Sequence, residues 1–250
     1  MGLLLVVSMI ALSSGCEDPS TSAEPAWRNE DPIAAALAQR SADDRARDAS
    51  RRPAEVLALA GIVPGMQVAD LMAGGGWYTE VLARTVGPTG RVYSHNNAIS
   101  KQRYGSVLRE RLRSSGVSNI YPVSQELDRL EFSASSLDAA FLVQFYHDTY
   151  WMGVNRAAMN RDVFSSLKPG GVYLIIDHSA KFDSGSRDVE TLHRVDEDLV
   201  EQELLSAGFE LVRKSELLRN DRDDRSESVF DDSIRGRTDR FLFVFKKPAA

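Results

Sequence analysis

Short, strongly apolar runs alternate along the chain with longer segments in which apolar and charged residues are mixed. The apolar runs, which predict strands, lie at residues 65–73, 90–96, 119–124, 136–148, 172–180, 209–216 and 240–247. The mixed segments, which predict helices, lie at residues 31–49, 51–65, 77–87, 97–115, 156–171 and 191–209. Strands that are apolar throughout and alternate with helices are typical of a parallel sheet buried on both faces. The pattern therefore predicts one doubly wound α/β domain over residues 31–250, with its ligand site at the carboxyl ends of the strands.

Two charged stretches change this picture little. Residues 215–239 lack a clear period, and we interpret them as a long loop or hairpin, which at that length is usually functional or mobile. The run DDRARDASRR interleaves Arg with Asp, which favours a solvated surface. The formal net charge is −6 and the pI is near 5.3, so no broad basic excess is present to meet phosphates. We therefore expect no nucleic-acid partner.

The N-terminus has a different character, because residues 2–15 are apolar and then rich in small side chains. This stretch is shorter than a membrane-spanning helix and fits the apolar part of a secretory signal. Cys16, the only cysteine, follows directly, and residues 13–16 (SSGC) resemble the lipobox of bacterial lipoproteins. The resemblance implies a signal peptide over residues 1–16 and a lipid on Cys16, with a polar tether over residues 17–30.

This interpretation predicts an exported protein, periplasmic or anchored to a membrane through Cys16 alone. It departs from the usual pattern in two respects. No Lys or Arg precedes the apolar run, and Leu12 lies one place before the usual lipobox leucine, with Ser13 in that position. The alternative is a buried N-terminal helix with an ordinary cysteine, in which case the protein would be cytoplasmic.

The stretch VADLMAGGGWYTE, residues 68–80, predicts a strand, a glycine turn and a helix. A dinucleotide loop requires a third glycine where this chain has Thr79, and an acid after the second strand, where Asn96 stands. An acid instead ends the first strand, at Asp70. A carboxylate there would repel a pyrophosphate but would suit a ligand with a positive amino-acid head group. An NAD(P) enzyme is therefore a distant alternative.

The same loop resembles motif I of the class I S-adenosylmethionine-dependent methyltransferases. Asp70, Gly74 and Gly76 match that motif, whereas Met72 stands where the family has its first glycine. Glycines at 74 and 76 would let the backbone approach a ligand with no Cβ in the way, and a methionine at 72 can turn its side chain aside. The resemblance implies S-adenosylmethionine as the cofactor, bound by the loop residues Asp70, Met72, Ala73, Gly74 and Gly76.

The resemblance extends over about residues 53–247. It implies that Asn96, in place of the usual acid, bonds the ribose hydroxyls, that Glu126 meets the adenine amino group, and that Leu127 lies beside the ring. The segments LKPGG and SAGFEL are also frequent in the family. The family fold implies a seven-stranded, mostly parallel sheet whose last strand is antiparallel. The segments FYHDTYW, IIDHSA, HRVDEDLV and GRTDRF further resemble a bacterial group known only as predicted methyltransferases.

Candidate chemistry follows the fourth predicted strand, at Tyr146, His147 and Asp148. In class I methyltransferases this position faces the methyl acceptor. The unperturbed pKa of a histidine suits the removal of a proton from a hydroxyl or thiol, so His147 is our first candidate for a base. Asp148 could hold the imidazole tautomer. The alternative is that His147 and Asp148 only cap the next helix or bond to neighbouring loops.

We expect no resident metal, although three other assignments remain open. Asp148, Asp177 and His178 could together bind a divalent ion, since oxygen and imidazole ligands suit Mg, Mn or Zn. His193 is expected at the start of a helix, facing the crevice or simply beginning the helix. Residues 235–240 could close over an acidic substrate or form a salt-bridged turn.

These observations lead to one preferred function and two rivals. We expect a class I methyltransferase that acts on a small-molecule acceptor, at oxygen or another heteroatom. The first rival is a binding protein on a degenerate methyltransferase fold, which export favours because S-adenosylmethionine is made in the cytoplasm. The second rival is a metal-assisted O-methyltransferase that uses Asp148, Asp177 and His178.

Overall fold

The computed structural model of the protein describes residues 1–2 and 31–249. The predicted signal peptide, the lipobox with Cys16 and the tether lie outside the described residues, except for the first two positions of the signal. Among the helices that the structure describes, none combines the length and the apolar character needed to cross a bilayer.

A seven-stranded sheet forms the centre of residues 31–250. Its spatial order is β3-β2-β1-β4-β5-β7-β6. The strands are β1 Gln67–Leu71, β2 Arg91–His95, β3 Ile120–Val123, β4 Leu137–Val143, β5 Leu167–His178, β6 Glu210–Ser215 and β7 Arg240–Lys246. β1 to β5 pair in parallel, whereas β7 runs antiparallel between β5 and β6. The predicted doubly wound sheet with an antiparallel last strand is confirmed.

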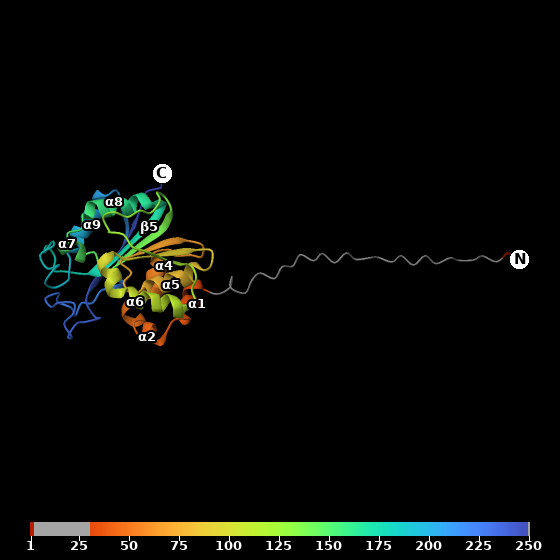
Figure 1. Cartoon of the computed structure of the whole chain (residues 1–250), viewed down its shortest axis with the longest axis horizontal. Helices are drawn as coiled ribbons and strands as arrows, with labels where there is room; N and C mark the ends of the chain where they lie inside the picture. The colour runs from red at the N-terminus through yellow and green to blue at the C-terminus, as the bar shows by residue number, and fades with distance from the viewer. Residues whose placement is uncertain (3–30, 250) are drawn as a thin grey trace. The chain divides into compact units, whose positions relative to one another are not determined.

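Successive side chains of a strand feed two different cores, because they point to opposite faces of the sheet. In β1, Ala69 packs into one core and Val68 into the other. Helices α8 and α9 close the first core, and α4 and α5 close the second, as their positions on either side of the sheet show (Figure 1). The central strands β1, β4, β5 and β7 are mostly apolar because both faces of the sheet are buried there, whereas the edge strands β3 and β6 are largely exposed.

The helices partly follow the predicted boundaries. They are α1 Pro32–Ala38, α2 Ala42–Arg45, α3 Asp48–Arg51, α4 Pro53–Leu59, α5 Trp77–Val86, α6 Ala98–Ser115, α7 Asp148–Trp151, α8 Arg156–Ser166, α9 Glu197–Ser206 and the 3₁₀ turn η2 Glu216–Leu218. The single helix predicted over residues 31–49 is wrong. Ser41 caps a new helix by accepting a bond from the Asp44 amide, and three short helices result.

Three predicted strand and helix limits also need correction. β4 ends at Val143, five residues before the predicted end, so His147 and Asp148 lie in the turn that opens α7. The LKPGG segment belongs to β5 rather than to a helix end. α9 begins at Glu197, which leaves His193 in the preceding loop and not at a helix start. The first and third corrections place His147 and His193 in loops rather than inside a strand or a helix.

The long segment that connects η2 to β7 is held against the sheet by buried ion pairs. Arg194, which is fully buried, donates to both oxygens of Asp223 at 2.9 and 3.0 Å. Its Nε atom donates to the Glu227 carbonyl at 2.9 Å. These contacts fix the segment next to the end of β5, where it can border a site.

Candidate functional site

The predicted cofactor loop leaves β1 through a series of left-handed residues. Met72, Gly74 and Gly76 have φ angles of 52°, 57° and 80°. Glycine adopts this region freely, whereas a methionine is strained there. The Met72 side chain is buried in the core that also contains Leu127. The methionine thus fills the core beneath the loop.

Packing also requires two of the glycines. A Cβ at Gly75 would lie 2.9 Å from Val107, and one at Gly76 would lie 2.8 Å from Leu108, both on α6. At Gly74 the nearest atom would be a ring carbon of Tyr104, at 3.8 Å. Close packing against α6 therefore explains the glycines at 75 and 76. At Gly74 a side chain would meet only an ordinary contact, so packing does not explain that glycine.

Asp70 lies at the carboxyl end of β1, with 3% of its surface exposed. The Thr79 hydroxyl donates to its Oδ2 at 2.5 Å. Burial raises the pKa of Asp70 to about 6, against the opposing effects of the Thr79 bond and the Arg51 charge. A carboxylate with this pKa is ionised at neutral pH, but burial destabilises its charge, and a positively charged ligand would stabilise it.

The end of β2 bonds to the glycine loop. The Asn96 side chain accepts from the Gly74 amide at 2.9 Å and donates to the Gly74 carbonyl at 3.2 Å. His95 accepts from the Met72 amide through Nδ1 at 3.4 Å, and its Nε2 lies 3.0 Å from the Gln125 carbonyl. Burial lowers the pKa of His95 to about 4, so the ring is neutral. Asn96 thus organises the loop, and its ribose contact stays a prediction.

The predicted adenine segment follows β3. Glu126 is exposed, whereas Leu127 is buried in the core beside Met72. The Glu126 carboxylate forms no ion pair within the described part of the chain. It is therefore available to a ligand, as its predicted role requires.

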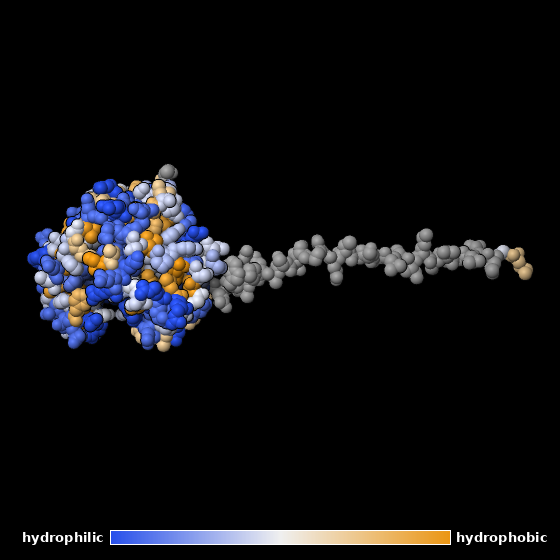
Figure 2. Space-filling view, viewed as in Figure 1, coloured by the Kyte–Doolittle hydropathy of each residue, from blue (hydrophilic) through white to orange (hydrophobic). Residues whose placement is uncertain are grey.

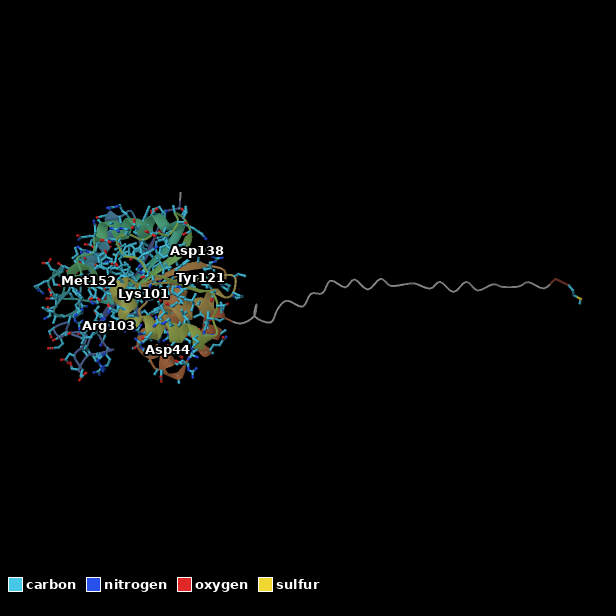
Figure 3. The ribbon with its side chains drawn as sticks, viewed as in Figure 1. Asp44, Lys101, Arg103, Tyr121, Asp138 and Met152 are labelled. Atoms are coloured by element: carbon cyan, nitrogen blue, oxygen red, sulfur yellow. The ribbon has the colours of Figure 1, made fainter. Side chains whose placement is uncertain are left out.

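A charged N-terminal cap covers Trp77, at the start of α5. The guanidinium carbons of Arg40, Arg47 and Arg51 lie 5.0, 5.7 and 4.8 Å from the Trp77 ring centroid. Asp44, labelled on α2 in Figure 3, is buried and ion-paired with Arg111 of α6. The prediction that this charged run is a solvated surface holds for most of residues 43–52, but Asp44 is buried, and Arg47 and Arg51 make cation–π contacts with Trp77.

Arg51 reaches from this cap to the sheet, and sequence reasoning missed it. Its Nη2 donates to Gln144 Oε1, just after β4, at 3.2 Å. Burial, together with the nearby Arg47 charge, lowers the pKa of Arg51 to about 10, which still leaves a cation at neutral pH. Asp70 and Arg51 thus offer opposite charges at one end of the glycine loop.

His147 lies between two carboxylates beyond β4. Its Nδ1 is 2.7 Å from Asp177 Oδ1, and its Nε2 is 3.2 Å from Asp148 Oδ1. The His147 amide donates to Asp177 Oδ2 at 2.7 Å. Burial opposes a charge here, but Asp177 and Asp148 overcome it and raise the pKa of His147 to about 10. The pair predicted as base and orienting carboxylate does come together.

Tyr146, the third predicted catalytic residue, has other partners. It is fully buried, and its hydroxyl donates to Glu203 of α9 at 2.7 Å. Asn160 of α8 donates to the same hydroxyl at 2.9 Å. Burial raises the pKa of Tyr146 well above its ordinary value. These contacts tie Tyr146 to the helices that cover the sheet rather than to His147.

His193 joins the cluster from the loop before α9. Its backbone is left-handed, with φ of 54°, and its Nδ1 lies 3.3 Å from Asp148 Oδ1. Its ring packs edge-on to Trp151 and Phe230, at centroid distances of 6.2 and 4.8 Å. Both aromatic residues are about half exposed, so an apolar rim borders the cluster.

The predicted metal ligands Asp148, Asp177 and His178 do not form a set. Asp177 is occupied by His147 and by the His178 amide, and the two ring nitrogens of His178 face Thr238 and Gln144. Among the described residues, the group whose ligand atoms converge is His147, Asp148 and His193, all within 4.8 Å of one another. Asp177 and His178 are already engaged in hydrogen bonds, so their ligand atoms do not converge with Asp148 on a common point.

Of the two alternatives predicted for residues 235–240, the structure supports the salt-bridged turn. Asp239 pairs with Arg219 and Arg225, and Arg240 donates to the Ser50 carbonyl at 2.6 Å. A cavity of about 580 Å³ lies where this turn faces the N-terminal helices, and Figure 2 shows a notch in that edge of the domain. Its walls carry Arg52, Arg219, Arg222, Arg237 and Arg240.

Comparison with known proteins supports the fold assignment. The chain is 31% identical over 120 residues to the ubiquinone/menaquinone biosynthesis C-methyltransferase UbiE of Pasteurella multocida, covering 48% of this chain and 42% of that protein. It is 32% identical over 121 residues to the protein of the same name from Shewanella pealeana, covering 48% and 45%. The chain thus spans less than half the length of these curated relatives. No protein-family model matches the sequence.

Solved structures resemble most of the domain. A SAM-dependent methyltransferase from Aquifex aeolicus has a TM-score of 0.58 at 20% identity, covering 78% of this chain and 88% of that one. A putative methyltransferase from Bacillus halodurans has a TM-score of 0.59 at 17% identity, covering 79% and 99%. With the strand order and the glycine loop described above, these likenesses define the fold of the class I methyltransferases.

Proposed function

We propose that this protein transfers a methyl group from S-adenosylmethionine to a small-molecule acceptor. The observation that carries the proposal is the junction of β1 and α5, where a buried acid precedes two left-handed glycines. The partial sequence likeness to curated methyltransferases supports it. The cofactor carries an ammonium and a carboxylate on its methionine part, so a site needs both signs of charge. Asp70 and Arg51 supply them.

Asp70 would face the ammonium group, and Arg51 would bind the carboxylate. The Arg51 guanidinium can form a bidentate pair with a carboxylate, which fixes orientation as well as charge. The Gln144 side chain, which accepts from Arg51 at 3.2 Å, would hold it in place. Asn96 would face the ribose, and Glu126 the adenine amino group.

Methyl transfer is an in-line displacement, so the protein mainly orients the two reactants. The acceptor would lie over His147, Asp148 and His193, beside the rim of Trp151 and Phe230. We predict attack by oxygen or another heteroatom. His147 is our candidate base, but with a pKa of about 10 it is protonated at neutral pH and would accept a proton only at higher pH. A carbon acceptor is the second candidate, and the name C-methyltransferase of the curated relatives favours it.

We also propose, from the sequence alone, that the chain is exported and anchored through a lipid on Cys16. Labelling of cells with a radioactive fatty acid, comparing wild type with Cys16→Ala, tests this. Label on the wild type alone supports the anchor. Equal absence of label with the protein in the cytoplasm contradicts it.

Calorimetric titration of S-adenosylmethionine into the purified protein tests the main proposal. We expect micromolar binding, weakened at least a hundredfold in Asp70→Asn and in Arg51→Met. The matched control is Asp138→Asn, because Asp138 lies near the other end of the sheet and pairs with Lys168. Absence of binding to a folded wild type would contradict the proposal and favour the binding-protein alternative.

A further inference from the structure

The geometry points to a divalent transition-metal site formed by His147, Asp148 and His193. These residues come from the turn between β4 and α7, the first position of α7 and the loop before α9. Each offers one ligand atom, and the three atoms lie within 4.8 Å of one another. This set differs from the one that the sequence suggested, since His193 lies 45 residues from Asp148 along the chain.

The separations of the ligand atoms suit a shared ion. His147 Nε2 and His193 Nδ1 lie 3.2 and 3.3 Å from Asp148 Oδ1. Two ligands bound at about 2.0–2.1 Å in a tetrahedral arrangement lie about 3.3 Å apart. Both distances from Asp148 are therefore near the value for ligands of one ion, and the two imidazole ligand atoms lie within 4.8 Å of each other.

Asp177 provides the supporting contact that metal-binding histidines usually have. Its Oδ1 lies 2.7 Å from His147 Nδ1, which keeps a hydrogen on that nitrogen and leaves Nε2, on the side of Asp148, as the atom that an ion would bind in place of a proton. Asp177 is fully buried, and it also accepts from the His147 and His178 amides. A carboxylate held in this way is rigid, so the imidazole is pre-oriented as a ligand.

The other two ligands are also held from outside the cluster. The Trp151 indole donates to Asp148 Oδ1 at 2.9 Å and orients the carboxylate. The His193 ring lies edge-on to His147, with centroids 5.4 Å apart, and is flanked by Trp151 and Phe230. Protein ligands would thus occupy one side of the ion, and the half-exposed rim would leave positions for an acceptor.

The ligand types select the class of ion. Two imidazole nitrogens and one carboxylate oxygen suit zinc, manganese, cobalt or ferrous iron, whereas calcium and magnesium prefer oxygen alone. Such an ion would polarise an acceptor oxygen and lower the pKa of its proton. This role rests on the proposed function and would replace the base role of His147. Binding of the ion itself does not depend on methyl transfer.

Metal titration of the full chain, produced without a histidine tag and stripped with a chelator, tests the inference. Calorimetry with Zn²⁺, and the visible absorption of bound Co²⁺, should show one ion per chain. His193→Asn and Asp148→Asn should weaken binding at least a hundredfold, and Asp177→Asn about tenfold to a hundredfold. Asn tolerates the left-handed backbone at 193, which protects folding in that variant.

His178→Asn is the matched control, because this buried histidine also lies near His147 but bonds to Thr238 and Gln144. It should bind metal as the wild type does. Lack of saturable binding to the folded wild type would overturn the inference, as would equal binding by His193→Asn. Titration of S-adenosylmethionine into the metal-free protein separates this failure from failure of the proposed function.

Discussion

The two halves of the carboxyl edge bury ionisable groups with opposite results. At the β1–β2 half, burial raises the pKa of Asp70 to about 6 and lowers that of His95 to about 4. At the β4–β5 half, the pKa of His147 rises to about 10 despite burial, and that of Asp148 falls. The difference comes from partners. His95 bonds mainly to the backbone, whereas His147 touches two carboxylates.

Burial therefore favours the neutral form where opposite charges are too weak to outweigh it, as at Asp70, and not where two carboxylates contact the group, as at His147. In the β1–β2 half, which we call the cofactor half, the carboxylate of Asp70 accepts a hydrogen bond from a hydroxyl, and a bound cation would stabilise its charge. In the β4–β5 half, which we call the acceptor half, His147 already pairs with the carboxylates of Asp148 and Asp177. The cofactor half should consequently depend on its ligand for stability at neutral pH, and the acceptor half on its own ion pairs.

The largest expected effect is that of Asp177→Ala, which would break the acceptor half. It leaves the His147 imidazole and two buried amides without their acceptor, so unfolding free energy should fall by about 3–5 kcal/mol. Urea unfolding at neutral pH measures this. Glu110→Ala, which removes an exposed partner of Arg113, is the control and should change nothing measurable. A loss in Asp177→Ala no larger than the control would show that the buried pair is unimportant.

The second prediction concerns the pH dependence of Asp70→Asn. Folded Asp70 keeps its proton up to about pH 6, whereas the unfolded chain loses it near pH 3.8. The folded state binds more protons in this window, so stability falls as pH rises through it. At pH 8 the ionised residue costs roughly 3 kcal/mol, from about two units of pKa. The amide should therefore stabilise the protein by up to that amount.

Urea unfolding of wild type and Asp70→Asn at pH 4 and pH 8 checks the sign. We expect a gain at pH 8 and little difference at pH 4. Saturation with S-adenosylmethionine should remove the gain, because the wild type alone would bind the cofactor tightly. A variant that is equally stable or less stable at pH 8 would show that the Asp70 charge is well compensated in the free protein.

The fold was largely predictable because the central strands β1, β4, β5 and β7 are buried on both faces and so are mostly apolar. The N-terminal helices were not, because local capping decided them. Ser41 begins a new helix, and Arg52 adopts a left-handed φ of 47° before Pro53, which disfavours helical backbone at the preceding residue. Such breaks depend on single side-chain bonds that a periodic pattern does not reveal.

The candidate site was predictable where it is local in sequence. Asp70 and its glycines are recognised together because they occupy consecutive positions, and His147 and Asp148 follow one strand. The contacts between Arg51 and Gln144 and between His193 and Asp148 join residues 93 and 45 positions apart. Strand order brings them together, but which side chains meet depends on loop paths that composition does not specify.

The third prediction separates packing from backbone strain in the glycine loop. In Gly76→Ala the new Cβ would lie 2.8 Å from Leu108 at a φ of 80°, so we expect a loss of about 2–3 kcal/mol. Gly116→Ala is the matched control, with a φ of 67° and open space around it, and should lose about 1 kcal/mol. Equal losses in urea unfolding would show that the contact with α6 costs nothing.

The smallest expected effect is that of Met72→Gly, which restores the glycine usual in the family. Relief of the left-handed backbone should return about 1 kcal/mol, whereas loss of a buried side chain should cost about 2 kcal/mol or more. The net loss should be about 1 kcal/mol. Met159→Ala, at a more deeply buried methionine of α8, lacks the compensating strain and should lose about 2–5 kcal/mol. If both variants lost the same free energy of unfolding, the left-handed backbone at Met72 would carry no measurable strain.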